Sequence, residues 1–198
     1  MSDLIYKIKF LSDWHCGSGL TAGSDVDLLV IKDKNRLPFV PGKTLKGLFK
    51  EAANVMKDFS EDKGKADWDL FIKSHFGIQT KNDDDKKDKN EDSNQSSKGK
   101  CYFSNAVLSG ELQNNIIENK LEDTLLRKIS ATKIDDKGIA VEHSLRAFEV
   151  VIPLELYGKI SDVEGSFKMG KCLKYIKQLG TTRNRGLGRC IISIMEDK

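Results

Sequence analysis

Two glycine-rich stretches of the sequence bring together residue types that can do chemistry. Residues 15–27, HCGSGLTAGSDVD, hold a histidine, a cysteine and two aspartates among three glycines. Residues 180–190, GTTRNRGLGRC, hold three glycines and three arginines. Glycine lets a ligand approach the backbone closely, and the guanidinium fork of arginine matches a phosphate. The second stretch is therefore predicted to bind phosphate, with a solvated glycine-rich turn as the ordinary alternative.

A third stretch, PGKTLKG at 41–47, resembles a nucleotide-binding P-loop at first sight. A P-loop also needs a glycine five positions before Gly42, and Leu37 stands there, so an NTPase is excluded. What survives is the N-terminus of a predicted helix, where free N–H groups and the helix dipole favour an anion. Lys43, Thr44 and Lys46 would strengthen that preference.

The net charge of +3 is unevenly distributed over the 198 residues. Seven basic residues and no acidic residue lie between positions 166 and 190. A concentrated positive segment in a nearly neutral chain is expected of a protein that binds a polyanion. The alternative is a helix whose lysine face is simply solvated.

The composition narrows the class of protein further. Hydrophobic residues make up 38% of the chain and charged residues 32%, and no apolar run is long enough for a membrane span or a signal peptide. The four cysteines are widely spaced, form no CxxC pair and have no zinc-ribbon spacing. We expect a cytoplasmic protein whose cysteines are free thiols.

The elements that must position these residues follow a regular order. Apolar periodicity predicts, in chain order, a strand at 4–12, helices at 43–57 and 66–76, a strand at 101–109, a helix at 111–127, a strand at 145–158, a helix at 167–179 and a strand at 189–196. Insertions aside, the order is β α β β α β. This order predicts an α+β fold with a ferredoxin-like (RRM-like) split βαβ core, in which helices cover one face of an antiparallel sheet. We expect a single domain over 1–198, with residues 79–100, which include no apolar residue, as a disordered insertion.

Several ordered motifs resemble those of one known family. They are GSDVDLLVIKD, LPFVPGKTLKGLFKEAA, CYFSNAVL, KIDDKGIAVEHSLRAFEVVIP and the glycine-rich GTTRNRGLGR. In this order they are similar to the RAMP superfamily of CRISPR-associated proteins, in particular the backbone subunits of type III effector complexes.

The resemblance implies a protein that polymerises along a guide RNA, holds its phosphates and presents its bases to a target RNA. Its expected partners are the guide CRISPR RNA, the target RNA, other RAMP subunits, a small helical subunit and a large polymerase-like subunit. A protruding thumb hairpin at about 130–146 would interrupt the guide–target duplex, with Ile134 and Val141 as apolar wedges. The residues expected to contact RNA are His15, Lys43, Thr44, Lys46, Gly180, Arg183, Asn184, Arg185, Gly186 and Arg189.

The resemblance also implies cleavage of the paired target RNA at Asp27, which matches the aspartate after the first strand in cleaving members. The 2′-hydroxyl of RNA can act as the nucleophile, and a carboxylate can help to move the proton or bind a divalent cation. Mg²⁺ or Mn²⁺ would be the cofactor, with Asp27 as one ligand, no dedicated metal cage and no organic cofactor. Asp25 and Asp33 are nearby carboxylates, and an aspartate at a strand start is more often a cap or turn residue.

Two other functions stay open at this point. The chain could be a related structural or capping subunit without catalysis. It could also be an RNA-processing endoribonuclease in which His15 acts as general acid or base, because an imidazole titrates near neutrality. Against this, WHCGSG fits equally well a buried Trp14 at the strand end and a histidine that touches backbone or RNA.

Overall fold

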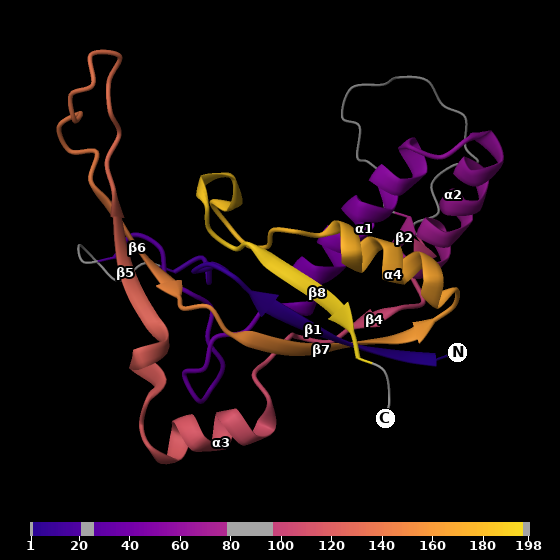
Figure 1. The fold of residues 1–198 in the computed structure, drawn as a ribbon, viewed down its shortest axis with the longest axis horizontal. Helices are drawn as coiled ribbons and strands as arrows, with labels where there is room; N and C mark the ends of the chain where they lie inside the picture. Colours follow the sequence, from indigo (N-terminus) through magenta and orange to yellow (C-terminus); the bar gives the residue numbers. More distant parts are fainter. Residues whose placement is uncertain (1, 21–25, 79–96, 196–198) are drawn as a thin grey trace.

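The computed structural model describes residues 2–20, 26–78 and 97–195. Its centre is a four-stranded sheet in which every pair of neighbouring strands is antiparallel (Figure 1). The strand order is β4-β7-β1-β8. The four strands are β1 (Ser2–Phe10), β4 (Tyr102–Phe103), β7 (Glu155–Val163) and β8 (Cys190–Ile194). The expected mixed α/β architecture with an antiparallel sheet is therefore confirmed.

Buried residues alternate along β1, and they show which face of the sheet the helices cover. Its even-numbered residues Leu4, Tyr6, Ile8 and Phe10 are buried, and the ring of Tyr6 lies 5.9 Å from that of Phe49 in the helix above. Successive side chains of a strand point to opposite faces, so the odd-numbered residues face away from the helices. The helices are α1 (Gly42–Asp58), α2 (Asp62–Phe76), which packs on α1, and α4 (Ser166–Tyr175).

A second, two-stranded antiparallel sheet forms a hairpin that extends beyond the central sheet (Figure 1). Its strands are β5 (Leu126–Ala131) and β6 (Arg146–Val151), and the segment 130–146 is its outer part. The prediction of one long strand at 145–158 is wrong. The chain leaves the β5–β6 ladder at Pro153, because proline has no backbone N–H to donate. The chain then pairs with β5 on one side of the proline and with β1 on the other.

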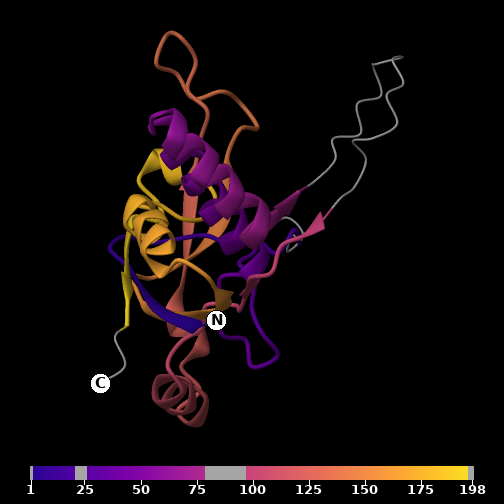
Figure 2. The same cartoon turned by 90° about the vertical axis from the view of Figure 1, so that its right-hand side faces the viewer.

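The helix expected at 111–127 is also too long. α3 (Gly110–Glu118) begins at Ser109, whose hydroxyl accepts a hydrogen bond from the backbone N–H of Leu112. It ends where Lys120 adopts the left-handed conformation, with φ 55°. The N–H of Leu121 then bonds the carbonyl of Ile116, the pattern of a Schellman cap. A short 3₁₀ helix, η1 (Glu122–Leu125), leads into β5. Figure 2 shows α3 and the tip of the hairpin at opposite ends of the molecule.

Most of the polar segment 79–100 lies outside the described residues, since the structure resumes at Ser97. Strand β3 (Ser97–Lys98) pairs with β2 (Gly77–Ile78), so these last residues are ordered and return beside the end of α2. Within the part of the chain that the structure describes, no helix combines the length and the apolar character needed to cross a membrane. All four cysteines are free thiols, as the sequence predicts, and the structure shows that all four are buried.

Candidate nucleic-acid interface

Two of the segments that are predicted to bind anions meet in one groove, which we call the α1 groove. It has a volume of about 470 Å³ and is lined by the chain after β1, by one face of α1 and by the glycine-rich loop. Four of the predicted residues line it: Lys43, Thr44, Gly180 and Arg183. The remaining lining residues are Cys16, Gly17, Pro41, Gly47, Leu48, Glu51 and Thr181.

The N-terminus of α1 is positioned by close packing at Gly42. A Cβ at this residue would lie 2.1 Å from the carbonyl oxygen of Phe103, so only glycine fits there. The backbone N–H of Gly42 donates to Oδ1 of Asn105 over 2.9 Å. The first turn of α1 includes no acidic residue, and Lys43 adds a positive charge to the positive end of the helix dipole. This end of the groove therefore favours an anion.

The glycine-rich loop is held at its base by two close backbone approaches. Gly180 has φ +100°, and a Cβ there would lie 2.4 Å from the carbonyl oxygen of His15. Gly188 has φ +70°, and a Cβ there would lie 1.9 Å from the carbonyl oxygen of Leu179. Both positions require glycine because of their conformation and their lack of space. The loop between them includes the 3₁₀ turn η2 (Arg183–Arg185).

The three arginines of this loop point to different places. Arg183 lines the α1 groove, and its guanidinium lies 3.6 Å from a carboxylate oxygen of Glu51. Arg185 lines a separate hollow of about 780 Å³ together with Ile134 and Val141 of the β5–β6 hairpin. Arg189 is exposed at the base, where its N–H donates to the hydroxyl of Ser12 over 3.0 Å. Asn184 and Gly186 are exposed at the tip of the loop.

Lys46 is the predicted residue of α1 that the structure separates from the others. It is half-buried and does not line the α1 groove. Its charge instead acts on the thiol of Cys101, where it opposes the rise in pKa that burial causes. Residues 43 and 46 differ by three positions, but the sequence alone does not reveal which of them faces the loop.

His15 is a buried residue, with 2% of its surface exposed. Its Nδ1 lies 2.6 Å from the carbonyl oxygen of Glu149, and its ring meets Phe148 edge-on at 6.5 Å. Its own carbonyl accepts a hydrogen bond from the N–H of Thr181. His15 thus connects β6 with the glycine-rich loop, which favours the interpretation that it touches backbone over that of direct contact with RNA.

Asp27 is exposed and lies beside β6. Its backbone N–H donates to the carbonyl of Ala147 over 2.7 Å, and its Oδ2 accepts from the N–H of Ala147 over 2.8 Å. Ala147 pairs with Ser130 near the outer end of the β5–β6 ladder, where the segment that includes Ile134 and Val141 begins. Asp33 is a turn residue, since its Oδ1 accepts from the N–H groups of Asn35 and Leu37. Asp25 lies outside the described residues.

The side chains near Asp27 do not form a metal cage by themselves. Across the described ranges, no three or more His, Cys, Asp or Glu side chains are grouped so that they could hold a metal ion. The Asp27 carboxylate can supply one oxygen ligand, and Mg²⁺ usually completes its shell with phosphate oxygens and water. Asp27 could therefore supply one ligand to a divalent cation whose other ligands come from outside the protein.

Two residues of the α1 groove, Gly47 and Glu51, escaped the sequence analysis. These residues lie four and eight positions after Lys43, which places all three on one face of a helix. This spacing is the feature of the sequence that could have identified them. Glu149 was also missed: its carboxylate accepts from the N–H of Val30 and pairs with Lys32 at 2.9 Å. It thereby fixes the segment that follows Asp27 against β6.

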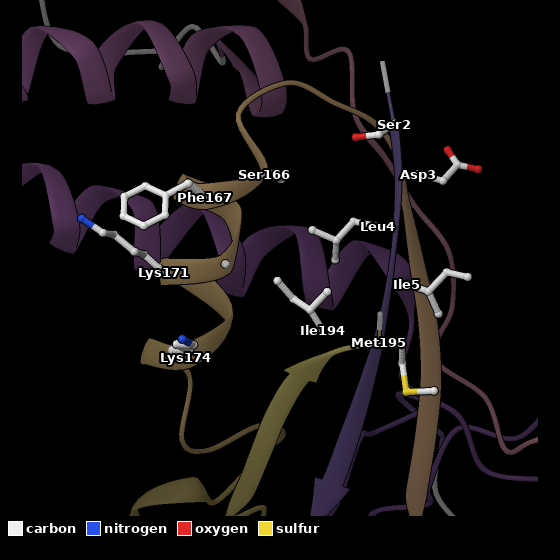
Figure 3. Close-up of a pocket in the computed structure, with 11 residues that line it drawn as sticks. Ser2, Asp3, Leu4, Ile5, Ser166, Phe167, Lys171, Lys174, Ile194 and Met195 are labelled. Atoms are coloured by element: carbon white, nitrogen blue, oxygen red, sulfur yellow. The ribbon is translucent and has the colours of Figure 1, made fainter. Parts of the chain in front are cut away.

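A different groove of about 450 Å³ lies where β1 starts, between α4 and the end of β8 (Figure 3). Leu4, Ile5, Ile194 and Met195 give it an apolar lining, and the ammonium of Lys171 lies 4.6 Å from the centre of the Phe167 ring. None of the residues that the sequence predicts to contact RNA lines it. The predicted chemistry is thus concentrated at the α1 groove and the hairpin.

Antiparallel sheets and a basic groove at a helix N-terminus define a mixed α/β protein with a surface suited to a polyanion. The chain belongs to the RAMP superfamily, whose family model matches residues 7–191. This confirms the membership that the ordered motifs indicate.

Two solved structures contain similar chains. A chain of the type III-B Cmr-beta complex bound to cognate target RNA superimposes with a TM-score of 0.68 at 13% identity, covering 98% of this chain and 97% of that chain. A chain of apo Cmr-beta gives 0.67 at 14% identity, covering 98% of each. At these identities the similarity concerns the fold. No curated protein sequence matches the chain.

Proposed function

We propose that the chain is a guide-RNA-binding backbone subunit of a type III CRISPR interference complex. The observation that carries this proposal is the α1 groove, in which residues from two distant parts of the chain form one basic surface. The RAMP family and the similarity to Cmr-beta chains, one of them bound to cognate target RNA, support it. Other RAMP subunits, a small helical subunit and a large polymerase-like subunit are the proposed protein partners.

The central sheet has the features of a ferredoxin-like split βαβ core, and we infer this fold for it. The order β4-β7-β1-β8 supports the inference, as do the positions of α1 between β1 and β4 and of α4 between β7 and β8. The other helices and the two small sheets are then insertions into this core. The loops at one end of the sheet, including 180–189, are left to bind the RNA backbone.

In the proposed complex the protein holds the guide by its phosphates, and base pairing reads the target sequence. A phosphate in the α1 groove would meet the N-terminus of α1, Lys43 and Arg183. Lys43 and Thr44 are exposed and Arg183 is partly exposed in the chain alone, so these residues are accessible to a strand that lies across the groove. Binding of this kind depends strongly on salt, because each phosphate contact releases counterions.

The test is the affinity of the chain for a fluorescent single-stranded RNA at several salt concentrations. We expect Arg183→Ala to weaken binding and to reduce the slope of log affinity against log salt by about 0.7, the value for one lost phosphate contact on a single strand. The matched control is Arg36→Ala, which removes an exposed arginine that pairs with Asp123 and does not line the groove. An Arg183→Ala slope equal to that of the wild type would show that the loop does not touch the RNA backbone.

We propose, as the finer part of this function, that Asp27 takes part in cleaving the paired target RNA. Ile134 and Val141 on the hairpin would displace a base pair, and the freed 2′-hydroxyl could then attack the adjacent phosphate in line. The new P–O2′ bond replaces the P–O5′ bond, and the leaving 5′-oxygen takes up a proton. The Asp27 carboxylate would accept the 2′-hydroxyl proton or bind the divalent cation, which would neutralise phosphate charge when bound.

One observation favours the structural subunit as the second candidate. The Asp27 carboxylate already accepts a hydrogen bond from Ala147, so it has a role in the fold without any catalysis. The RNA-processing enzyme is weaker, because the His15 imidazole is buried and bonded to a backbone carbonyl.

A further inference from the structure

One face of α1 runs along the α1 groove and changes its charge from end to end. Lys43, Gly47 and Glu51 recur every four residues and all three line the groove. Lys43 lies at the positive end of the helix, and Glu51 lies about 12 Å further along, at 1.5 Å per residue. The groove therefore begins with groups that attract a phosphate and ends beside a carboxylate that repels one.

Glu51 is the one acidic side chain, within the described ranges, that lines this groove or the groove next to it. The neighbouring groove, of about 400 Å³, shares Leu48, Glu51 and Arg183 with the first and continues along the segment 175–178. Lys43 and Arg183 line the α1 groove, and Lys177 lines its neighbour. A single carboxylate at the border of these two grooves therefore repels a polyanion that lies in the α1 groove.

Glu51 also pairs with the arginine on which RNA binding would depend. The two side chains are 60% and 39% exposed, and the charged groups are 3.6 Å apart. Ion pairs as accessible to water as this one are weak and easily exchanged. A phosphate that enters the groove can therefore take Arg183 from Glu51, but the released carboxylate then stays close to the phosphate.

We propose that Glu51 competes with the RNA phosphate for Arg183 and thereby lowers the affinity of the groove for RNA. The inference rests on the proposed function, since it needs RNA in the α1 groove. In the free chain the pair keeps the guanidinium at the groove and cancels its charge. In the complex the RNA phosphate replaces the Glu51 carboxylate beside Arg183. The carboxylate still repels the phosphate, which reduces the net free energy of binding. An RNA strand that touches only this groove is therefore bound weakly. A guide RNA that contacts several subunits makes more phosphate contacts, which offset the affinity lost at each groove.

Glu51→Gln tests this, because glutamine keeps the shape and removes the charge. We expect the affinity for a fluorescent single-stranded RNA to rise about three- to tenfold at low salt, and the gain to shrink as salt increases because screening weakens both charges. The matched control is Glu118→Gln, an exposed glutamate on α3, which measures the effect of net charge alone. In an Arg183→Ala background the gain from Glu51→Gln should fall to less than half.

The outcomes separate the inference from the proposed function. If Arg183→Ala weakens binding but Glu51→Gln behaves like Glu118→Gln, the competition is refuted and the function stands. If Glu51→Gln weakens binding, Glu51 is an RNA ligand or a support for Arg183, and the competition is again refuted. If none of these substitutions alters the affinity for RNA, RNA does not bind in the α1 groove. That result overturns both the competition and the proposed function.

Discussion

At the scale of single residues, Asp27 has two roles that can be separated. Its Oδ2 accepts a hydrogen bond from the N–H of Ala147, which ties the loop to the start of β6. A side-chain amide oxygen can accept the same hydrogen bond, but an amide takes up no proton at neutral pH and, being neutral, is a weaker ligand of a divalent cation than a carboxylate. Asparagine therefore preserves the structural role and removes the chemical one, whereas alanine removes both.

We accordingly expect Asp27→Asn to abolish cleavage of labelled target RNA by the assembled complex while guide binding and assembly are unchanged. Asp27→Ala should also lose cleavage and should in addition lower the free energy of unfolding by about 1 kcal/mol, the usual contribution of one hydrogen bond. Asp136→Asn in the hairpin is the matched control and should cleave normally. Undiminished cleavage by Asp27→Asn at every site would rule out a catalytic role for Asp27.

The predictability of the site differs between residues for a physical reason. Lys43, Thr44 and Arg183 were chosen by residue type and local chemistry, and the fold gathers them in one groove. The direction of a side chain depends on tertiary packing, so the sequence could not reveal that Lys46 does not line the groove or that His15 is buried. Glu51 was missed because a lone acid on a helix has no special meaning until Arg183 lies opposite.

At the scale of elements, the helix itself does not explain why glycine stands at position 47 inside α1. Glycine is less favourable than alanine in a helix interior by about 1 kcal/mol. A Cβ at Gly47 would meet no atom within 4 Å, so packing within the chain does not require glycine. Gly47 lines the α1 groove between Lys43 and Glu51, where a bare backbone allows a bound strand to lie close to the helix.

Gly47→Ala should therefore change stability and RNA binding in opposite directions. We expect the free energy of unfolding to rise by about 0.5–1 kcal/mol, because alanine is the better helix former. RNA affinity should fall about tenfold, since an extra methyl in a filled contact costs roughly 1–3 kcal/mol. Chemical denaturation and fluorescence anisotropy measure the two effects on the same preparation.

The matched control for this substitution is Gly110→Ala at the start of α3, where a Cβ would also meet open space. It should leave RNA affinity unchanged because α3 does not line the groove. If Gly47→Ala binds RNA as tightly as the wild type, the strand does not approach α1 at this point.

The elements themselves were predictable where the hydrophobic pattern was strong. The alternation of apolar and polar residues in β1 and the helical spacing of apolar residues in α1 predict the bounds of both elements to within one or two residues. The sequence failed where a local conformation interrupts a pattern, as at the left-handed Lys120 and at Pro153. It also could not supply the sheet register, because β1 pairs with strands more than 140 residues away.

At the scale of the whole molecule, the four cysteines lie within the core. Burial raises the pKa of the thiols of Cys16, Cys172 and Cys190 to about 12, and burial together with the charge of Asp162 raises that of Cys101 to about 11. In an unfolded chain the pKa of each thiol would return to its ordinary value of 9.0. The thiols therefore ionise in the unfolded chain at a lower pH than in the folded one.

This difference predicts that stability is lost on the alkaline side. Below pH 9 both states keep their thiol protons and the stability is fully present, whereas above pH 9 the unfolded chain alone releases them, so unfolding becomes easier. Each thiol contributes up to about 1.4 kcal/mol per pH unit. Urea unfolding under reducing conditions between pH 7.5 and 10 should show a free energy of unfolding that is nearly constant up to about pH 9 and falls above it, and Cys172→Ala should make that fall shallower. A free energy of unfolding that stays constant over this range would mean that the folded core does not hold these thiols protonated.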